Sequence, residues 1–368
     1  MKILLLANAN SIHTKRWAIS LAQRHLEILL FSLEKSNDSE YEKYSNILII
    51  DGKFQNNYSK DGEISKITLI QYLPKLFKYI KLFNPNIVHA HYATSYGLLG
   101  ALCGFKPFVL SVWGSDIYDF PKISIFHKLM IQFNLYRADK ILSTSHVMVL
   151  ETKQYTNKEI HVTPFGIDLS KFKKMEFHTD FSPETIVVGT VKTLSSKYGI
   201  DYLIKAFKIV KENNSDLSLK LMIVGDGEDK IKLVNLCRNL NISDDVVFVG
   251  KVNNNLVPNY LNVIDIYVAL STLESESFGV AIVEASASEK PVVVSNVGGL
   301  PEVVANNKTG FVVESKNPQE AAKKIEKLIL DKALRVKMGK AGRERVKELY
   351  NWEENVSLMV ATYSKLIK

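Results

Sequence analysis

Short apolar runs alternate with helical patterns along most of the chain. The runs Lys2–Ala7 and Ile186–Val191 have the length and composition of strands that are buried on both faces of a parallel sheet. Between such runs, segments such as Thr14–His25 carry apolar residues at helical spacing. This alternation predicts an α/β protein with doubly wound parallel sheets. The other predicted strands are Glu27–Ser32, Ile47–Ile50, Ile87–His89, Phe108–Val112, Lys140–Ser143, His161–Val162, Leu219–Val224, Val246–Val249, Ile264–Leu270 and Pro291–Ser295.

The alternation is interrupted once, near the middle of the chain. Residues 170–183 lose their periodicity and become polar, which is typical of a linker. A second series follows, with helices predicted over Gly199–Glu212 and Lys230–Leu240. We therefore expect an N-terminal domain over residues 1–169 and a second domain over residues 184–348, with a central cleft between them.

Composition and charge narrow the class of protein. The 368 residues are 46% hydrophobic and 23% charged, which excludes a disordered chain or an extended coiled coil and leaves room for two globular domains. Lysine and arginine exceed the acidic residues by 47 − 39 = 8, so nucleotide phosphates, an anionic membrane face and nucleic acid are all candidate partners. Only Cys103 and Cys237 are present, which favours the cytosol. No apolar run is long enough to span a bilayer, so we expect any membrane contact to be peripheral, at the inner face of the cell membrane.

The most informative stretch is Ser271–Glu284, which reads STLESESFGVAIVE. It follows the predicted strand Ile264–Leu270 and leads into a predicted helix, Gly279–Glu289. Backbone N–H groups at the start of such a helix favour an anion. Glu276 before the helix and Glu284 within it can reach one ligand, and carboxylates accept well from the hydroxyls of a sugar or ribose. Taken alone, an E-x7-E spacing is more often a helix cap and a solvated helix residue.

Three other polar or glycine-bearing turns follow predicted strands in the second half. They run from Lys192 to Lys197, from Gly225 to Glu228 and from Ser295 to Gly299. The carboxyl ends of parallel strands lie at one edge of a sheet, so we expect these turns to form one pocket with Ser271–Gly279. Two ammonium groups, a helix N-terminus and two carboxylates in one pocket suit a nucleotide diphosphate that carries a sugar.

Polar residues also follow the strands of the first half, and we expect them at the opposite side of the same cleft. His89 and His91 form an H-A-H pattern that could suggest a metal, but no third ligand of suitable spacing is near. We therefore expect a substrate contact or a hydrogen-bonded strand end, and no metal. The candidate residues of this half are His13, Thr14, His91, Trp113 and Asp116.

Two segments, Tyr72–Phe83 and Phe120–Phe133, combine basic with apolar residues. Such segments can lie on an anionic membrane surface. They fit equally well as core helices with a solvated edge. The lysines are Lys75, Lys78 and Lys81 in the first segment and Lys122 and Lys128 in the second.

Taken together, these motifs resemble those of the retaining group 1 glycosyltransferases of the GT-B fold, the large family four that uses nucleotide-sugar donors. The resemblance covers nearly the whole chain, and E-x7-E with its internal Phe-Gly is its most specific part. The motifs are IHTKRW, NPNIVHAH, GSD, RADKILSTS, PFGID, the Lys192 and Lys197 pair, VGDGE, ESFGVAIVE, GGLPEVV and TGFVV.

The resemblance implies a transfer of a hexosyl or N-acetylhexosaminyl group from a nucleotide sugar, such as a UDP-sugar, to a hydroxyl of a saccharide or lipid-linked saccharide. Synthesis of capsule, lipopolysaccharide or another cell-surface glycan is the implied setting. It implies that Glu276 contacts the donor sugar, that Lys192 and Lys197 hold the diphosphate, and that Glu284 binds the ribose. It also implies that residues 349–368 form a helix crossing back to the first domain. Further implied donor contacts are Gly225, Gly227, Val252, Phe278 and Gly279.

Three departures from the family pattern stand out. Asn8–Ser11 replaces a glycine-rich loop, which weakens the case for close backbone approach to a phosphate. Trp113 stands where many members have histidine, and Phe165 replaces a usual asparagine.

The chemistry of such a transfer needs charge stabilisation at the leaving diphosphate more than it needs a base, and Lys192 and Lys197 supply it. No Asp-x-Asp metal signature occurs in a predicted cleft turn, so we expect no cofactor and no essential divalent ion. A nucleotide-sugar epimerase with His89 and His91 as acid and base, and a non-catalytic nucleotide-sugar-binding protein, are the alternatives. A nucleic-acid-binding function lacks any recognition motif.

Overall fold

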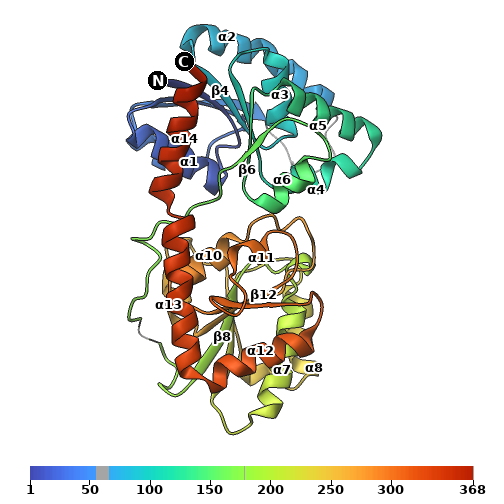
Figure 1. Ribbon diagram of the computed structural model, residues 1–368, viewed down its shortest axis with the longest axis vertical. Helices are drawn as coiled ribbons and strands as arrows, with labels where there is room; N and C mark the ends of the chain where they lie inside the picture. The colour runs from blue at the N-terminus through green and yellow to red at the C-terminus, as the bar shows by residue number, and fades with distance from the viewer. Residues whose placement is uncertain (55–65, 178, 368) are drawn as a thin grey trace. The chain divides into compact units, whose positions relative to one another are not determined.

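The protein is described here by a computed structural model that covers residues 1–54, 66–177 and 179–367. It divides into two compact units, which are connected twice by the chain (Figure 1). The first unit comprises Met1–Pro164 together with Glu354–Lys368, and the second comprises Phe165–Glu353. The polar segment 170–183 lies inside the second unit, so the chain passes between units earlier than the loss of periodicity predicts.

The first unit is built on seven parallel strands in the order β3-β2-β1-β4-β5-β6-β7. The order runs outward from β1 in both directions, as in a doubly wound sheet. The strands are β1 (Lys2–Leu6), β2 (Glu27–Glu34), β3 (Ile47–Phe54), β4 (Ile87–His91), β5 (Phe108–Val112), β6 (Lys140–Ser143) and β7 (Ile160–Val162). The helices are α1 (Ile12–Gln23), α2 (Leu73–Phe83), α3 (Ser95–Cys103), α4 (Ser115–Tyr118), α5 (Ile125–Arg137), α6 (His146–Thr152) and α14 (Trp352–Ile367), with 3₁₀ turns η1 (Ser39–Lys43), η2 (Lys66–Tyr72) and η3 (Phe120–Lys122).

Helices cover both faces of this sheet (Figure 1). On one face, Leu76 of α2, Leu99 of α3 and Ile131 of α5 join a single apolar core with the strands. On the other face, α14 lies beside α1, where Arg24 donates a hydrogen bond to Ser357 at 3.0 Å. The uniformly apolar strands follow from this double cover, since each side chain of a central strand meets a helix layer.

The second unit repeats the plan with six parallel strands in the order β10-β9-β8-β11-β12-β13. The strands are β8 (Ile186–Val191), β9 (Leu219–Val224), β10 (Val246–Gly250), β11 (Ile266–Ala269), β12 (Val292–Ser295) and β13 (Gly310–Val313). The helices are α7 (Ile200–Asn213), α8 (Lys230–Asn239), α9 (Val257–Val263), α10 (Val280–Ala287), α11 (Leu300–Val303), α12 (Pro318–Leu330) and α13 (Lys332–Leu349), with 3₁₀ turns η4 (Ser196–Tyr198) and η5 (Ser243–Asp245).

The predicted α/β class with two doubly wound parallel sheets is confirmed, but two details of the prediction were wrong. The strand β13 was not predicted, so the second sheet has one strand more than the pattern indicates. The predicted helical segment Phe120–Phe133 is interrupted after Lys122 and resumes at Ile125. Among the helices of the described ranges, none is both long and apolar enough to cross a membrane.

Candidate active site

Lys192 and Glu276 form an ion pair in the second unit, with 2.8 Å between Nζ and Oε1. Lys192 directly follows β8, and Glu276 lies in the loop between β11 and α10, so neighbouring strands bring the two residues together. Both side chains are mostly buried, with 17% and 15% of their surface exposed. Burial alone would lower the pKa of the Lys192 ammonium, but the Glu276 carboxylate together with Tyr267 and Tyr198 more than offsets it, so that this pKa is raised. Lys192 is therefore a stable cation at neutral pH.

Tyr198 in η4 contacts both predicted diphosphate lysines. The Lys192 Nζ lies 4.4 Å from the centre of the Tyr198 ring, and the exposed Lys197 Nζ lies 4.8 Å from the same centre. The face of an aromatic ring attracts cations at such distances. The ring thus brings two ammonium groups to one place, although sequence reasoning did not single out Tyr198.

The β8–α7 loop is tied to its neighbours through backbone atoms. Thr272 donates its N–H to the Lys197 carbonyl at 2.8 Å, and Leu194 donates to the Asp226 carbonyl at 3.1 Å. Gly225 has a φ of 141°, and a Cβ there would lie 1.9 Å from the Lys192 carbonyl oxygen. A Cβ at Gly227 would lie 2.3 Å from the Leu194 carbonyl oxygen. These two predicted donor-contact glycines are required by the packing of one loop on another, whatever they bind.

The two glutamates before α10 have different partners. The Glu274 carboxylate accepts the Gly298 N–H at 2.7 Å, and the Glu276 carbonyl accepts the Gly299 N–H at 2.9 Å. Glu274 therefore fastens the β11–α10 loop to the turn after β12. The Glu276 side chain is left to face Lys192.

Phe278 belongs to the core, although it is one of the predicted donor contacts. It is 2% exposed and packs edge-on against Phe165 and Tyr350, with ring centres 5.9 and 5.4 Å away. The phenylalanine that departs from the family pattern at position 165 thus supports the loop that ends at Gly279, the residue before α10.

Glu284 and Val252 are both half-buried. Burial raises the pKa of Tyr267 to about 12, and the Glu284 carboxylate adds to the rise, which places this glutamate near that tyrosine. The Tyr267 hydroxyl donates to the Val191 carbonyl at 3.2 Å, immediately before Lys192. Val252 follows β10, whose last residue, Gly250, accepts the Gly225 N–H at 2.9 Å.

In the first unit, the predicted residues His13, His91 and Trp113 form an aromatic cluster. The Trp113 ring centre lies 5.9 Å from that of His13 and 4.6 Å from that of His91. Burial, aided by Arg16, lowers the pKa of His13 to about 4, and burial with His13 nearby lowers the pKa of His91 to about 3. Both imidazoles are neutral at pH 7. Within the described residues, the buried Nδ1 of His91 and Oγ1 of Thr14 have no hydrogen-bond partner.

Asp116 has a structural role in the first unit. Its carboxylate has no exposed surface and accepts the N–H groups of Ala93 at 2.7 Å, Gly114 at 2.7 Å and Trp113 at 3.1 Å. Desolvation raises its pKa to about 6. The side chain fixes the turn that carries Trp113, and the described conformation leaves it no surface for a sugar contact.

His89 is enclosed in the same unit. Its Nδ1 lies 2.6 Å from the Tyr363 hydroxyl and its Nε2 lies 2.7 Å from the Ser111 hydroxyl. The ring is fully buried, and burial holds its pKa well below the usual value. His89 and His91 lie on one side of β4, as the strand period predicts, with ring centres 4.7 Å apart. Both imidazoles are buried in the described conformation.

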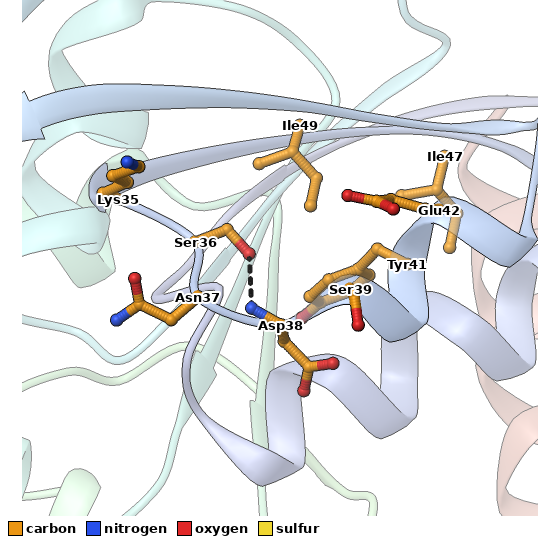
Figure 2. Close-up of a pocket in the computed structure, with 9 residues that line it drawn as sticks. All are labelled: Lys35, Ser36, Asn37, Asp38, Ser39, Tyr41, Glu42, Ile47 and Ile49. Atoms are coloured by element: carbon orange, nitrogen blue, oxygen red, sulfur yellow. Dashed lines mark hydrogen bonds between the residues drawn. The ribbon is translucent and has the colours of Figure 1, made fainter.

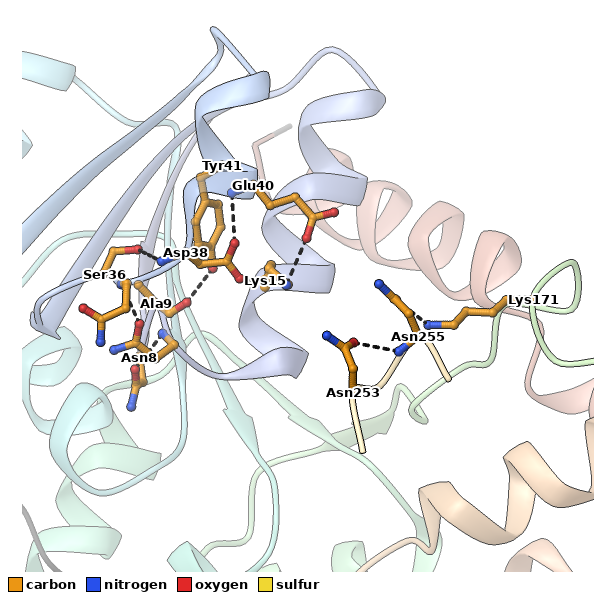
Figure 3. Close-up of polar contacts among 12 residues, drawn as sticks. Asn8, Ala9, Lys15, Ser36, Asp38, Glu40, Tyr41, Lys171, Asn253 and Asn255 are labelled. Carbon is orange, nitrogen blue, oxygen red and sulfur yellow. Dashed lines mark hydrogen bonds and ion pairs between the residues drawn. The ribbon is translucent and has the colours of Figure 1, made fainter. Parts of the chain in front are cut away.

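The first loop, Asn8–Ser11, is held by the segment after β2. The Tyr41 hydroxyl donates to the Ala9 carbonyl at 2.8 Å, and Lys15 pairs with Asp38 at 2.7 Å and Glu40 at 3.0 Å (Figure 3). The Lys15 ammonium in the first turn of α1 is therefore neutralised within its own unit. In the second unit, Lys171 donates to Asn255 at 3.2 Å (Figure 3).

An open hollow of about 470 Å³ lies beside η1, between the β2–η1 segment and the edge strand β3. Lys35, Tyr41 and Glu42 line it together with Ile47 and Ile49 (Figure 2). None of the predicted site residues lines this hollow, so it is separate from the constellations described above.

Comparison with known proteins identifies the family. A model described as "Glycosyl transferases group 1" matches residues 171–345, and a "Glycosyl transferase 4-like" model matches residues 2–145. The capsular polysaccharide biosynthesis glycosyltransferase CapM of Staphylococcus aureus is 30% identical over 355 residues, covering 85% of this chain and 88% of CapM. The N-acetyl-alpha-D-glucosaminyl L-malate synthase of Bacillus anthracis is 28% identical over 342 residues, covering 86% of each chain.

Among solved structures, Anabaena Alr3699/HepE in complex with UDP superposes with a TM-score of 0.81 at 20% identity, covering all of both chains. The two parallel-sheet units are those of the GT-B class of glycosyltransferases. The chain belongs to the group 1 glycosyltransferases.

Proposed function

We propose that the protein is a retaining glycosyltransferase that moves a hexosyl or N-acetylhexosaminyl group from a nucleotide-diphosphate sugar to an acceptor hydroxyl. The observation that carries the proposal is the buried Lys192–Glu276 pair beside Tyr198 and Lys197. It gives one small region both the cations that a departing diphosphate needs and a carboxylate that a reacting sugar needs.

The two lysines act on the leaving group. When the bond between the anomeric carbon and the phosphate oxygen breaks, its electron pair goes to the diphosphate. Lys192 and Lys197 stabilise that charge because Tyr198 already holds their ammonium groups together. The acceptor oxygen bonds to the anomeric carbon on the face that the diphosphate leaves, and its proton passes to a phosphate oxygen.

The two glutamates act on the sugars. The Glu276 carboxylate is paired with the Lys192 ammonium. When the diphosphate takes over the ammonium, the carboxylate is left to favour positive charge on the reacting ring. Glu284 accepts from the ribose hydroxyls. Two ammonium groups can do the work of a divalent ion here, so we expect turnover to survive chelation with EDTA.

The proposed donor is a UDP-sugar and the proposed acceptor is a saccharide or lipid-linked saccharide in cell-surface glycan synthesis. The UDP complex of the Anabaena structure, which was also solved with UDP-glucose, supports the choice of nucleotide. The name of the CapM relative supports the choice of setting. We further propose that the protein works at the inner face of a membrane.

The sharpest test replaces Lys197, because its side chain is exposed and its truncation leaves no buried cavity. Lys197→Ala should raise the barrier for transfer by about 2–4 kcal/mol, measured as release of UDP from a panel of UDP-sugars, while the melting temperature stays unchanged. Lys323→Ala, at an exposed position of α12, is the matched control and should keep full turnover. Undiminished turnover of the Lys197 variant at saturating donor would contradict the proposal.

Replacing Lys192 is a less specific test of the catalytic role than the sequence alone predicts. The sequence predicts an exposed ammonium whose loss leaves folding intact, but the side chain is mostly buried and paired. Lys192→Ala would leave the Glu276 carboxylate without its cation in a mostly buried place. That costs stability as well as turnover.

A further inference from the structure

The outer face of α5 carries an apolar stripe in the first unit. Its residues repeat at three- and four-residue intervals, which places them on one side of the helix. Phe126 is 78% exposed, Tyr136 72%, Ile125 61%, Leu129 54% and Phe133 39%. We call these five residues the α5 stripe. Ile123, just before the helix, extends it and is 53% exposed.

Single exposed apolar residues are ordinary, but a continuous stripe of large ones on one helix is not. The opposite side of α5 packs into the first unit, since Ile131, Asn134 and Leu135 are fully buried there. Asn134 also donates to the Ala93 carbonyl at 2.8 Å. The stripe therefore contributes nothing to the core of its own unit.

The charge within the segment that carries the stripe has one sign, and the flanking carboxylate of Asp139 is paired with Lys106 at 2.6 Å. The segment Phe120–Arg137 contains no acidic residue, while it includes Lys122, Lys128 and Arg137. Lys158 reaches the end of the stripe, with its Nζ 5.4 Å from the Tyr136 ring centre. The neighbouring carboxylate of Glu151 is already paired with Lys122 at 2.9 Å. An apolar strip edged by lysines complements a surface with negative headgroups above an apolar layer.

We propose that the α5 stripe is the surface by which this protein docks on an anionic lipid bilayer. The inference rests on the proposed function, because it supplies the contact that a membrane-borne acceptor requires. It also chooses between the two basic and apolar segments of the sequence. The helix α2 exposes only Phe77 and Leu82 among its large apolar residues, next to Lys78 and Lys81.

The test is co-sedimentation of the whole protein with vesicles of phosphatidylglycerol and phosphatidylcholine, and with vesicles of phosphatidylcholine alone. The wild-type protein should bind the anionic vesicles at low salt, and binding should weaken as salt is added. Phe126→Asp together with Leu129→Asp should weaken binding by tenfold or more, on the order expected for two lost apolar contacts and two added negative charges. Lys128→Glu should weaken it by roughly tenfold, since one positive charge is lost and one negative charge is added.

Matched controls come from the second unit. Ile231→Asp alters an apolar residue that is 76% exposed on α8, and Lys337→Glu reverses an exposed charge on α13. Both controls should bind vesicles as the wild type does. All variants alter exposed side chains, so an unchanged melting temperature verifies that they are folded.

Two outcomes would overturn the proposal. One is that the wild type ignores anionic vesicles at low salt, or that the stripe variants still bind as tightly as the wild type does. The other is a concentration-dependent dimer in sedimentation velocity that Phe126→Asp abolishes, which would assign the stripe to a second copy of the chain. Donor hydrolysis by the same variants separates this proposal from the catalytic one. Vesicle binding can be absent while UDP release is intact, and UDP release can be absent while vesicle binding is intact.

Discussion

Tyr198 matters to the site because its ring positions the ammonium groups of two lysines. Its ring is within 4.8 Å of the Nζ atoms of both Lys192 and Lys197. Tyr198→Leu should lower kcat/KM for the donor five- to thirtyfold, the equivalent of about 1–2 kcal/mol, whereas Tyr198→Phe should stay within a factor of three because the ring remains.

Tyr202 offers a matched control for that prediction. It packs against the same core, and the Lys205 Nζ lies 4.8 Å from its ring centre. Lys205, however, is paired with Asp201 at a distance of 3.0 Å and is not one of the two site lysines. Tyr202→Leu should leave donor kinetics unchanged. If Tyr198→Leu behaved like Tyr202→Leu, the ring would have no part in positioning the ammonium groups.

Glu276 and Glu274 stand two residues apart and should respond differently to the same change. Glu276→Gln keeps the shape and removes the charge that faces Lys192, so kcat should fall by about 100-fold or more with little change in KM. Glu274→Gln weakens the hydrogen bond to the Gly298 N–H and should cost about 1 kcal/mol of unfolding free energy with a smaller loss of kcat. Steady-state kinetics and urea denaturation of both variants decide the matter. A reversal of the two kcat effects would move the catalytic role to Glu274.

His91 should make the fold sensitive to acid. Its pKa is about 3 when folded and 6.5 when free, so the unfolded chain binds more protons between those values and stability falls as pH drops through that window. Between pH 7 and pH 5 this amounts to about 2 kcal/mol. Asp116 acts the other way, since its pKa of about 6 makes the folded chain the better proton binder between pH 6 and 3.8.

The difference between the wild type and His91→Phe isolates the histidine contribution. The phenyl ring can retain the contact with Trp113, and it has no Nδ1 to bury unpaired. The loss of unfolding free energy between pH 7 and pH 5 should therefore be smaller in the variant than in the wild type by about 2 kcal/mol, while the contributions of His13, His89 and Asp116 remain. Equal pH slopes for the two proteins would show that His91 titrates normally.

Sequence patterns brought Lys192 and Glu276 into one pocket, and the structure places them 2.8 Å apart, because parallel strands end at a common edge. The same patterns could not tell which polar side chains are exposed. Asp116 and Phe278 lie in motifs yet are buried, since a motif specifies a backbone turn as readily as a ligand contact. Tyr198 was missed because its contacts depend on side-chain direction.

At the level of elements, Gly225 is the residue on which the packing of two site loops depends. Gly225→Ala should cost at least 3 kcal/mol of unfolding free energy, because its Cβ would meet the Lys192 carbonyl at 1.9 Å and its φ is 141°. Gly250→Ala is the matched control. It has a φ of 84° but open space around the added Cβ, so only the backbone strain of about 1 kcal/mol should appear. Urea denaturation measures both, and equal losses would refute the packing argument.

Strands and helices were predictable where periodicity was strong. The strand β1 and the helix α7 lie within one or two residues of their predicted ends. The strand β13 was missed because its first residue, Gly310, continues the polar, turn-like stretch before it, so that only Phe311–Val313 show a strand pattern. The break before α5 was missed because Ser124 separates two apolar stretches that read as one helix.

At the scale of the whole molecule, α14 packs into the first unit, although the residues before it, Phe165–Glu353, form the second unit. Tyr363 is fully buried, and its hydroxyl lies 2.6 Å from the His89 Nδ1. Tyr363→Phe should cost about 1–3 kcal/mol of unfolding free energy in the first unit, because it leaves a buried ring nitrogen unsatisfied. Hydrogen exchange should localise the loss to β4 and its neighbours, and leave the amides of the second unit unchanged. Loss of protection in the second unit instead would contradict this assignment.

The two-unit plan was predictable because both halves repeat one alternation of strand and helix. The position at which the chain passes from one unit to the other was not predictable, because the polarity of a segment does not indicate which core it packs against. Phe165 and Tyr350 both contact Phe278, so the residues around both passages are packed into the second unit. The two passages also run side by side, where Ile167 donates its N–H to the Tyr350 carbonyl at 2.7 Å.

This double passage has a consequence for synthesis on the ribosome. Domains usually fold in the order in which they emerge, starting from the N-terminus. Here residues 165–353 are all made before Glu354–Lys368, so the later unit is complete while the earlier one still lacks its last helix. During that interval Tyr363 is not yet available to contact His89. The part of the protein that is translated first is therefore finished last.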